Sequence, residues 1–197
     1  MRVEDHRLIG DDVVYRESPN HSGPLPQPAD TLVLHFTAGA NAESAVRILS
    51  DPARQVSAHL VVARDGGVIQ LLPLNYLAWH AGRSCWHDRE EFNRFSISIE
   101  IENAGRLTER DGRLFSWFEC EYPSKEAVRA VHRNESELAY WHCYPQCQLD
   151  VVEELTRMLV AAYHLRYIHG HEEIAPDRKN DPGPAFPLDD LRTRLLP

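Results

Sequence analysis

The segment "FSISIEIEN" (residues 95–103) alternates strictly between apolar and polar side chains. Successive side chains of a β-strand point to opposite faces, so a period of two predicts a strand. One face carries the apolar residues Phe95, Ile97, Ile99 and Ile101. The other face carries the polar residues Ser96, Ser98, Glu100 and Glu102. The pattern therefore predicts a strand with one face packed in a core and one polar face.

Two further stretches predict strands on either side of a turn-rich middle. "TLVLHF" (31–36) is short and apolar, which is typical of a buried strand. "SAHLVVARDGGVIQLLPL" (57–74) holds two strand-like runs joined by "DGG" (65–67), which is a hairpin signal. The proline-rich segment 21–31 is predicted to be a loop.

Three segments predict helices: 41–51 with Asn41 as its N-cap, 148–166, and 187–196 with Pro187 near its start. The apolar stripe expected on the first comprises Ala45, Ile48 and Leu49. The stripe expected on the second comprises Val152, Leu155, Leu159 and Ala162. Because strands and helices interleave along the chain, we expect the α/β class, with a central mixed sheet flanked by helices.

The 197 residues fit one domain with a sizeable core, and no repeat or low-complexity linker divides them. Residues 1–197 are therefore expected to form a single domain. Residues 104–146 mix turns, aromatic residues and charges, and are predicted to be an insertion lying over that domain.

Charge and composition exclude several classes of partner. The formal net charge is -9, and the basic residues are scattered, which argues against nucleic acid and anionic membranes as partners. No apolar run approaches the roughly 20 residues that span a bilayer. The first 20 residues lack the apolar region of a signal peptide, so we expect a cytoplasmic protein, although release through host lysis would leave the same sequence trace. The cysteines are too few to predict a disulfide scaffold: Cys85, Cys120, Cys143 and Cys147.

The segment "HGHEEIAPDRKND" (169–181) combines histidines and acids on a stretch that proline stiffens. Two imidazoles and a carboxylate can hold a tetrahedral zinc ion and leave its fourth position open for water, as catalytic zinc sites require. Asp181 supplies the carboxylate, while the spacing leaves His169 and His171 open as alternatives. A solvated charged loop explains the same composition equally well.

Three other polar residues are candidates for the same chemistry. His35 ends the strand predicted at 31–36, where a lone histidine is more often a packed core residue than a ligand. Glu100, on the polar face of its strand, can act as a general base, although a solvent-facing position on a half-buried antiparallel strand is commoner. Lys179 can stabilise an oxyanion, or be an ordinary surface lysine.

A second metal site can be drawn from other cysteines and histidines, but ordinary reduced cysteines are the better interpretation. The residues of that alternative are Cys120, Cys143, Cys147, His132 and His142. His59 is predicted to pack within the sheet without a catalytic role.

Four motifs occur in the order seen in a known family: "LVLHFTAG", "SAHLVVARDGGVIQLLPLNYLAWHAG", "FSISIEIENAG" and "GHEEIAPDRKNDPGPAF". They resemble the zinc-dependent N-acetylmuramoyl-L-alanine amidases of the type 2 class, a superfamily that includes the peptidoglycan recognition proteins. The resemblance covers most of residues 30–188 and is greatest to the AmpD-like anhydromuramyl-peptide amidases. It implies an α/β fold with a zinc-containing groove at one face of the sheet.

The resemblance also implies roles for individual residues. The positions that match the ligands of one zinc ion are His35, His171 and Asp181. Glu100 matches the catalytic glutamate, and Lys179 matches the lysine that stabilises the transition state. The positions that match substrate-binding residues of the groove are Trp79, His80 and Asn93. The chain departs from the anhydro-specific branch at Glu91 and Arg94, both expected near the groove, so its sugar and stem-peptide preferences are not predicted.

The expected activity is hydrolysis of the amide between N-acetylmuramic acid and L-alanine, in peptidoglycan or in soluble muropeptides. Zinc-activated water would attack, with Glu100 as general base and Lys179 on the oxyanion. One alternative is a peptidoglycan-binding protein without turnover, and another is a phage lysin or antibacterial effector with the same chemistry. The complete set of site residues favours an enzyme, and the sequence makes no prediction of oligomeric state.

Overall fold

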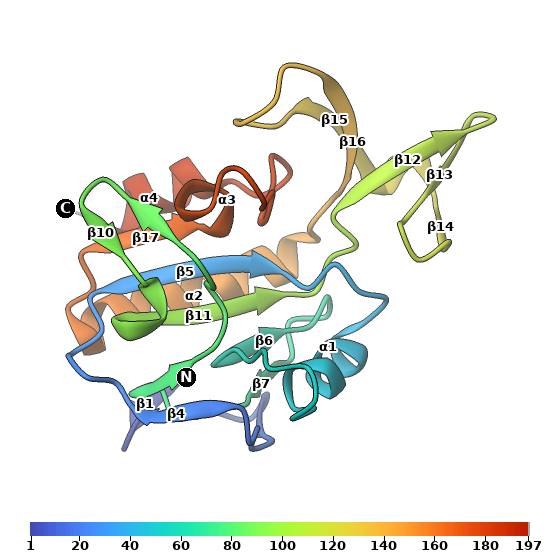
Figure 1. Ribbon diagram of the computed structural model, residues 1–197. Helices are drawn as coiled ribbons and strands as arrows, with labels where there is room; N and C mark the ends of the chain where they lie inside the picture. The colour runs from blue at the N-terminus through green and yellow to red at the C-terminus, as the bar shows by residue number, and fades with distance from the viewer. Residues whose placement is uncertain (197) are drawn as a thin grey trace.

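The computed structural model describes residues 1–196, and its centre is a six-stranded mixed sheet (Figure 1). The strand order is β17-β5-β11-β6-β7-β3, and all neighbours are parallel except the hairpin pair β6 and β7. The strands are β3 (Val13–Tyr15), β5 (Thr31–Phe36), β6 (Leu60–Val62), β7 (Val68–Gln70), β11 (Ser96–Ile101) and β17 (Tyr167–Gly170). The expected α/β class with a central mixed sheet is confirmed.

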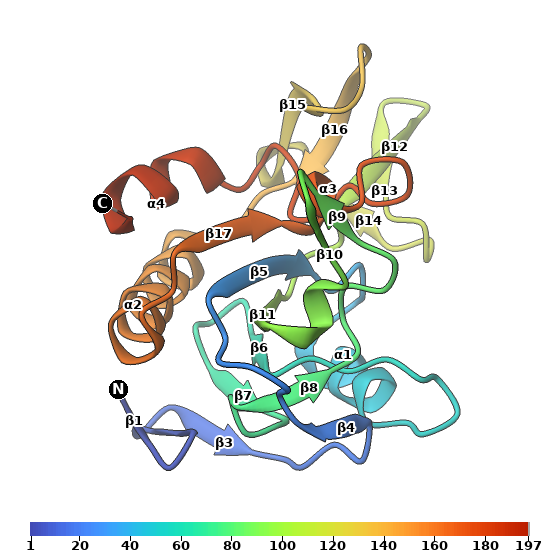
Figure 2. The same cartoon turned by 60° about the vertical axis from the view of Figure 1, so that its left-hand side comes forward.

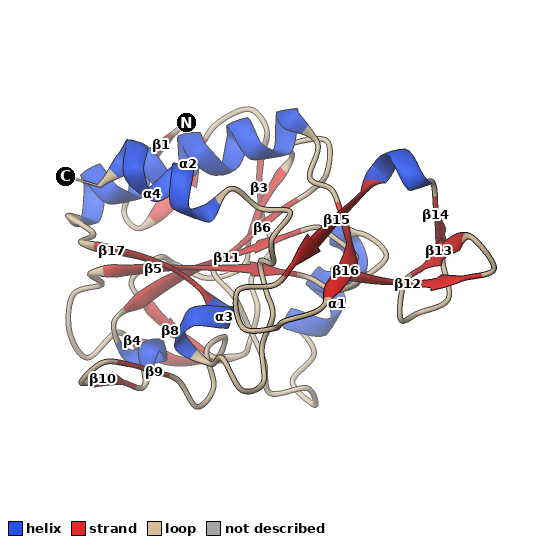
Figure 3. Cartoon of the chain, turned by 90° about the horizontal axis from the view of Figure 1, so that it is seen from above, coloured by secondary structure: helices blue, strands red, loops and turns tan. Residues whose placement is uncertain are grey.

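Helices lie on both sides of the sheet (Figure 3). On one side are α2 (Gln146–Tyr163) and α4 (Leu188–Leu195), whose apolar residues join the largest core cluster. On the other side are α1 (Ala42–Leu49) and the single turn α3 (His171–Ile174). The sheet is therefore buried on both faces, as parallel strands require.

The strand β11 shows how the two faces differ. Its isoleucines at 97, 99 and 101 belong to the core cluster under α2. Ser96 and Ser98 point to the other face and are also fully buried. The alternative in which Glu100 faces solvent from a half-buried antiparallel strand is therefore wrong, because β11 runs parallel to both of its neighbours.

Two details of the predicted helices need correction. Asn41 caps α1 as predicted, its side-chain oxygen accepting the Ser44 amide at 2.8 Å. Ile48 was expected to face the core but is 48% exposed, while Val46 is buried in its place. On α2 the predicted stripe holds except at Ala162, which is exposed.

Three short two-stranded ribbons complete the main body: β1 (Arg2–Glu4) with β2 (Arg7–Ile9), β4 (His21–Pro24) with β8 (Tyr76–Ala78), and β9 (Cys85–Trp86) with β10 (Arg89–Glu90). The segment predicted to be a loop at 21–31 therefore begins as a strand. A 3-10 turn, η1 (Phe92–Arg94), leads into β11.

The insertion, residues 104–146, forms a separate five-stranded antiparallel sheet that projects from one end of the main body (Figures 1 and 2). Its strand order is β14-β13-β12-β16-β15. The elements are β12 (Arg106–Arg110), β13 (Arg113–Phe115), β14 (Glu121–Tyr122), η2 (Ser124–Glu126), β15 (Ala127–Val131) and β16 (Leu138–His142). A small core of Ala104, Leu107 and Leu114 holds it together.

Within residues 1–196, no helix is both long and apolar enough to cross a membrane. All four cysteines are free thiols, and three of them are exposed.

Candidate active site

The ends of three neighbouring parallel strands bring the candidate residues together. In the pairing of β5 with β11, His35 lies directly opposite Glu100. In the pairing of β17 with β5, Gly170 lies opposite Leu34, so His171 follows the strand end beside His35. Ligands of open α/β sheets bind outside the carboxyl ends of parallel strands, and these residues occupy that position.

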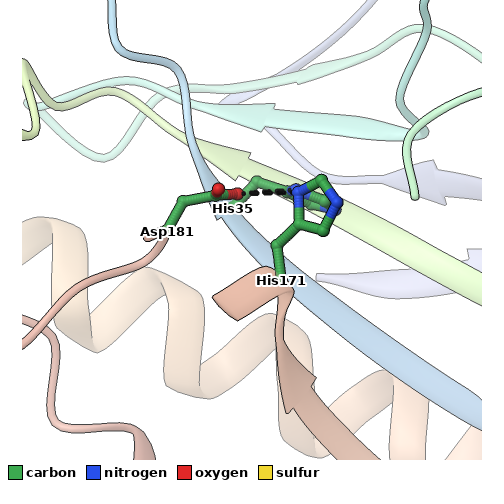
Figure 4. Close-up of side chains that lie close together, drawn as sticks. All are labelled: His35, His171 and Asp181. Carbon is green, nitrogen blue, oxygen red and sulfur yellow. Dashed lines mark hydrogen bonds and ion pairs between the residues drawn. The ribbon is translucent and has the colours of Figure 1, made fainter. Parts of the chain in front are cut away.

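Asp181 reaches the same point from the loop that follows α3. Its Oδ2 lies 2.9 Å from His35 Nδ1 and 3.1 Å from His171 Nδ1 (Figure 4). All three side chains are buried, with exposed fractions of 2%, 2% and 6% for His35, His171 and Asp181. Their potential ligand atoms lie within 4.8 Å of one another.

The hydrogen bonds of His171 define which of its nitrogens carries a proton. Nε2 lies 3.1 Å from the carbonyl oxygen of Ala81, which can only accept, so Nε2 carries the hydrogen. In the neutral ring, Nδ1 then carries no hydrogen, and its lone pair faces the Asp181 carboxylate. Two buried hydrogen-bond acceptors that face each other are unfavourable unless a cation lies between them.

His35 reaches the same state through a chain of side chains. The Ser96 hydroxyl donates to the Phe92 carbonyl, so Ser96 Oγ accepts from His80 Nε2 at 3.0 Å. His80 Nδ1 must then accept from His35 Nε2, also at 3.0 Å, which leaves His35 Nδ1 without a proton. Burial lowers the pKa of His35 to about 4, so its ring is neutral at pH 7.

Two bare imidazole nitrogens and a carboxylate oxygen thus converge on one point, and this donor set fits a divalent metal ion. Zinc prefers nitrogen, sulfur and oxygen ligands at about 2.0–2.2 Å, which places tetrahedral donors about 3.3 Å apart. The two distances to Asp181 Oδ2 are near that value. Hydrogen bonds on the far nitrogens of both rings fix their orientation, as the hydrogen-bond partners of metal-bound histidines do.

The structure also separates the two candidate histidines of "HGH". His169 points away from Asp181 and packs beside the rings of Trp86, Phe92 and Tyr167. Its charged neighbour is Glu173, at 3.5 Å. In a continuous strand, residues 169 and 171 would point to the same side; they diverge because β17 ends at Gly170 and α3 begins at His171. His171 is the residue that joins the cluster.

Glu100 and Lys179 both line the groove beside this cluster. Burial, and then the nearby negative charge of Asp181, raise the pKa of the Glu100 carboxyl well above its ordinary value, whereas Lys179 acts to lower it. A carboxyl with a raised pKa is suited to accept a proton and return it near neutral pH.

The groove has a volume of about 360 Å³ and two chemically different walls. One wall is the cluster with Glu100 and Lys179. Another part of the lining is apolar and comes from α1 and the segment after it: Ala45, Ile48, Leu49 and Val56. Ile48 and Val56 are 48% and 38% exposed, so the wall presents free apolar surface to a ligand. Sequence reasoning missed this wall because helical periodicity placed Ile48 in the core.

The three residues predicted to bind substrate lie at different depths. Trp79 lines the groove, and its indole N–H donates to Ser22 Oγ at 2.8 Å. His80 also lines the groove, while both of its ring nitrogens are bonded within the protein. Asn93 does not line the groove, and its amide oxygen accepts the backbone N–H groups of His80 and Ala81. Asn93 therefore holds the loop that carries the other two.

Glu91 and Arg94, the two departures from the family pattern, form an exposed ion pair with each other at 3.2 Å. Neither lines the groove that contains the cluster. Glu91 lines a neighbouring hollow of about 820 Å³, which is separated from the groove by Arg178, a residue common to both.

The insertion contacts the loop that carries two members of the cluster. His132 Nε2 lies 2.7 Å from Glu172 Oε2, and the same oxygen accepts the Gly183 amide at 3.0 Å. Glu172 follows His171 directly, and Gly183 lies two residues after Asp181. Both side chains of this pair are buried, with His132 1% and Glu172 2% exposed. No sequence signal identified the pair, because Glu172 reads as one of several acids in a charged segment.

The second metal site drawn from cysteines and histidines is not formed. Among residues 1–196, the group with metal-binding geometry is His35, His171 and Asp181. His132 is instead engaged with Glu172, and His142 accepts the Ala104 amide at 3.1 Å. His59 is fully buried between Ser98 and the Tyr76 carbonyl, as a packed residue of the sheet should be.

Comparison with known proteins gives consistent results. The sequence profile of a family described as N-acetylmuramoyl-L-alanine amidase matches residues 25–184. The 1,6-anhydro-N-acetylmuramyl-L-alanine amidase AmpD of Escherichia coli K12 is 37% identical over 142 residues, which cover 72% of this chain and 58% of AmpD. The N-acetylmuramoyl-L-alanine amidase AmiD of the same strain is 32% identical over 169 residues, covering 81% and 51%. The chain thus matches between half and three fifths of the length of these curated relatives.

Solved structures agree with this result. The complex of E. coli AmiD with anhydro-N-acetylmuramic acid-L-Ala-D-gamma-Glu-L-Lys superposes with a TM-score of 0.64 at 29% identity, covering 85% of this chain and 58% of that one. A crystal structure of a selenomethionine derivative of AmpD gives a TM-score of 0.71 at 24% identity, with both chains covered completely, and supports the fold. The resemblance carried by the four sequence motifs is confirmed: the chain belongs to the N-acetylmuramoyl-L-alanine amidase family.

Proposed function

We propose that the protein hydrolyses the amide bond between N-acetylmuramic acid and L-alanine, in peptidoglycan or in muropeptides derived from it, with one bound zinc ion. The observation that carries this proposal is the convergence of Nδ1 of His35, Nδ1 of His171 and Oδ2 of Asp181 beside a carboxyl of raised pKa. Family membership supports the choice of bond. The ligand in the AmiD complex supports the choice of muropeptides as the first substrates to test.

In this proposal His35 and His171 hold the ion through Nδ1, and Asp181 holds it through Oδ2. When bound, zinc supplies a Lewis acid that polarises a carbonyl and makes water acidic near neutral pH. The chain of hydrogen bonds from His35 through His80 to Ser96 keeps the first ring in its ligating tautomer. The Ala81 carbonyl does the same for His171.

Glu100 is the proton carrier of the proposed reaction. It lies opposite His35 across the strand pair and lines the groove, so it can take a proton from an attacking water. It then delivers that proton to the amine of L-alanine, which is a poor leaving group until it is protonated. Lys179, on the same wall, places a positive charge where the carbonyl oxygen becomes negative.

The groove also provides binding surface away from the reacting bond. Its lining includes the exposed apolar side chains of Ile48 and Val56, and also Trp79. We propose that this apolar lining receives the apolar faces of the substrate, with His80 and Asn93 holding the loop that shapes it.

The test is mass spectrometry of the products from two substrates, soluble anhydromuropeptides and intact sacculi, each with and without a chelator. We expect free stem peptide to appear and the chelator to prevent its release. Release from the soluble fragments alone would identify a recycling amidase, whereas release from sacculi would identify an enzyme that lyses the wall. If zinc is bound and no peptide is released from either substrate, the proposal is wrong and the non-catalytic binding protein becomes the better explanation.

A further inference from the structure

Trp117, in the insertion, is the most exposed large apolar side chain among residues 1–196, at 71%. It lies in the short loop between β13 and β14, and its indole contacts the segment that follows β5. An aromatic side chain that stays exposed to water adds no burial energy to folding, so we consider a role in binding for Trp117.

The indole ring is held in place although its surface is open. Its Nε1–H donates to the carbonyl oxygen of Ala38 at 2.7 Å. The ring of Phe118 meets it edge-on, with centroids 5.6 Å apart and planes at 89°, and Phe118 packs against the small core of the insertion. An aromatic ring that is already ordered loses little conformational entropy when a ligand covers it.

Ala38 connects this ring to the candidate active site. It lines the same groove as His35, and it lies three residues beyond His35 in the chain. Trp117 itself does not line the groove, and its hydrogen bond places the indole beside a residue that does. Ile48, another exposed apolar side chain, lines the same groove.

We infer that Trp117 is a stacking platform for a sugar ring beyond the muramyl residue that carries the scissile amide. This inference rests on the proposed function and specifies its substrate class, a muropeptide with at least two sugars. The C–H faces of a pyranose ring are flat and apolar, and they match the exposed face of an indole.

The charges around Trp117 favour a sugar over the stem peptide as the occupant. The stem peptide in the AmiD ligand carries ionised groups from its glutamate and lysine residues. Two arginines of the adjoining strands are already paired, Arg110 with Glu119 at 2.7 Å and Arg113 with Glu121. The loop therefore offers no free cation for a peptide carboxylate, whereas an uncharged sugar needs none.

The experiment compares two substrates that differ by one sugar: anhydromuramyl-tripeptide and N-acetylglucosaminyl-anhydromuramyl-tripeptide. For Trp117→Ala we expect kcat/KM to fall roughly tenfold on the disaccharide substrate, the factor expected for one lost aromatic stack, and to change less than about twofold on the monosaccharide. Trp117→Phe keeps a flat ring and should recover part of the loss. Leu138→Ala removes another exposed apolar side chain of the insertion, 53% exposed, and should change neither value.

Equal losses on both substrates would overturn the inference, because the ring would then contact the muramyl residue itself. No loss on either would overturn it as well. A second readout separates its failure from that of the proposed function: titration of the peptide-free disaccharide, followed by tryptophan fluorescence. If the wild-type protein cleaves neither substrate, the proposed function fails. In that case the titration is the remaining test of the role of Trp117. Equal affinity of the wild-type and Trp117→Ala proteins for the disaccharide would overturn the inference.

Discussion

The two sheets of this protein contribute to the groove in opposite ways. The central sheet is mostly parallel and buried on both faces, and its strand register alone sets His35 beside Glu100. The insertion sheet is antiparallel, small and rich in exposed ion pairs, and within the described chain it supplies none of the three clustered ligand atoms. Its contributions are contacts with segments that carry groove residues: His132 with Glu172, next to His171, and Trp117 with Ala38.

This difference suggests a division of labour. Residues paired by a buried parallel ladder cannot shift without breaking several hydrogen bonds, so the central sheet is suited to hold reacting groups. An appended sheet can change in sequence at its surface without disturbing that ladder, so it is suited to adjust metal affinity and substrate range. Changes in the central sheet should therefore abolish chemistry, while changes in the insertion should modulate it.

The largest effect is expected from removal of a proposed metal ligand. His171→Ala should lose bound zinc and lower turnover by at least about a thousandfold, because the Lewis acid is lost. Elemental analysis and peptide-release rates measure both effects. His169→Gln is the matched control, since His169 is equally buried but lies among aromatic rings away from the cluster. If both variants keep stoichiometric zinc, His171 is not a ligand.

The next effect separates proton transfer from metal binding. Glu100→Gln should keep its zinc and lower kcat by about two to four orders of magnitude, since the amide cannot accept a proton. Glu102→Gln is the control: Glu102 accepts the Arg64 backbone amide and does not line the groove. This substitution should leave kcat nearly unchanged. Normal turnover of the Glu100 variant would remove this residue from the mechanism.

A smaller effect tests the contribution of the insertion to the site. His132→Gln should weaken zinc binding by about 10- to 100-fold, because Glu172 then holds the ligand loop less firmly. Chelator competition measures the affinity directly. His142→Gln alters another buried histidine of the insertion, 3% exposed, that does not contact this loop. Equal losses of zinc affinity in the two variants would show a general effect on stability rather than positioning.

The smallest effect is on the pH dependence of the free energy of unfolding. The main body and the insertion each contain one buried histidine that can test it. Burial lowers the pKa of His59 beside β11, and of His142 in β16, to about 4. The unfolded chain binds these protons below about pH 6.5 while the folded chain does not, so stability is complete above that pH and falls as pH decreases toward 4. Between pH 7 and 5.5 each should contribute a loss on the order of 1 kcal/mol.

Urea unfolding at the two pH values provides the measurement. His59→Gln and His142→Gln should each show a smaller loss of stability on acidification than the wild-type protein. A single transition in which both variants behave alike would show that the two sheets unfold together. An unchanged pH dependence in both would mean that these histidines titrate normally in the folded protein.

Much of the fold was predictable because its signals are local. The alternation of "FSISIEIEN", the apolar run at 31–36 and the hairpin at 65–67 each define a strand from the sequence alone. The Asn41 cap and the start of α4 after Pro187 likewise depend on neighbouring residues. The exposure of Ile48 and Ala162 did not follow from the sequence. Helical periodicity predicts which residues share a face, but not how much of that face the rest of the protein covers.

The site divides in the same manner. The motifs alone identified the histidines, acids and lysine as candidates, and their order indicated the family. Spacing left His169 and His171 open and the family resemblance implied His171; the tertiary structure shows that His171 joins His35 and Asp181, while His169 packs among aromatic rings. Only it joined His35 to Ser96 through His80, and Trp117 to Ala38, since hydrogen bonds between residues far apart in the sequence leave no local pattern.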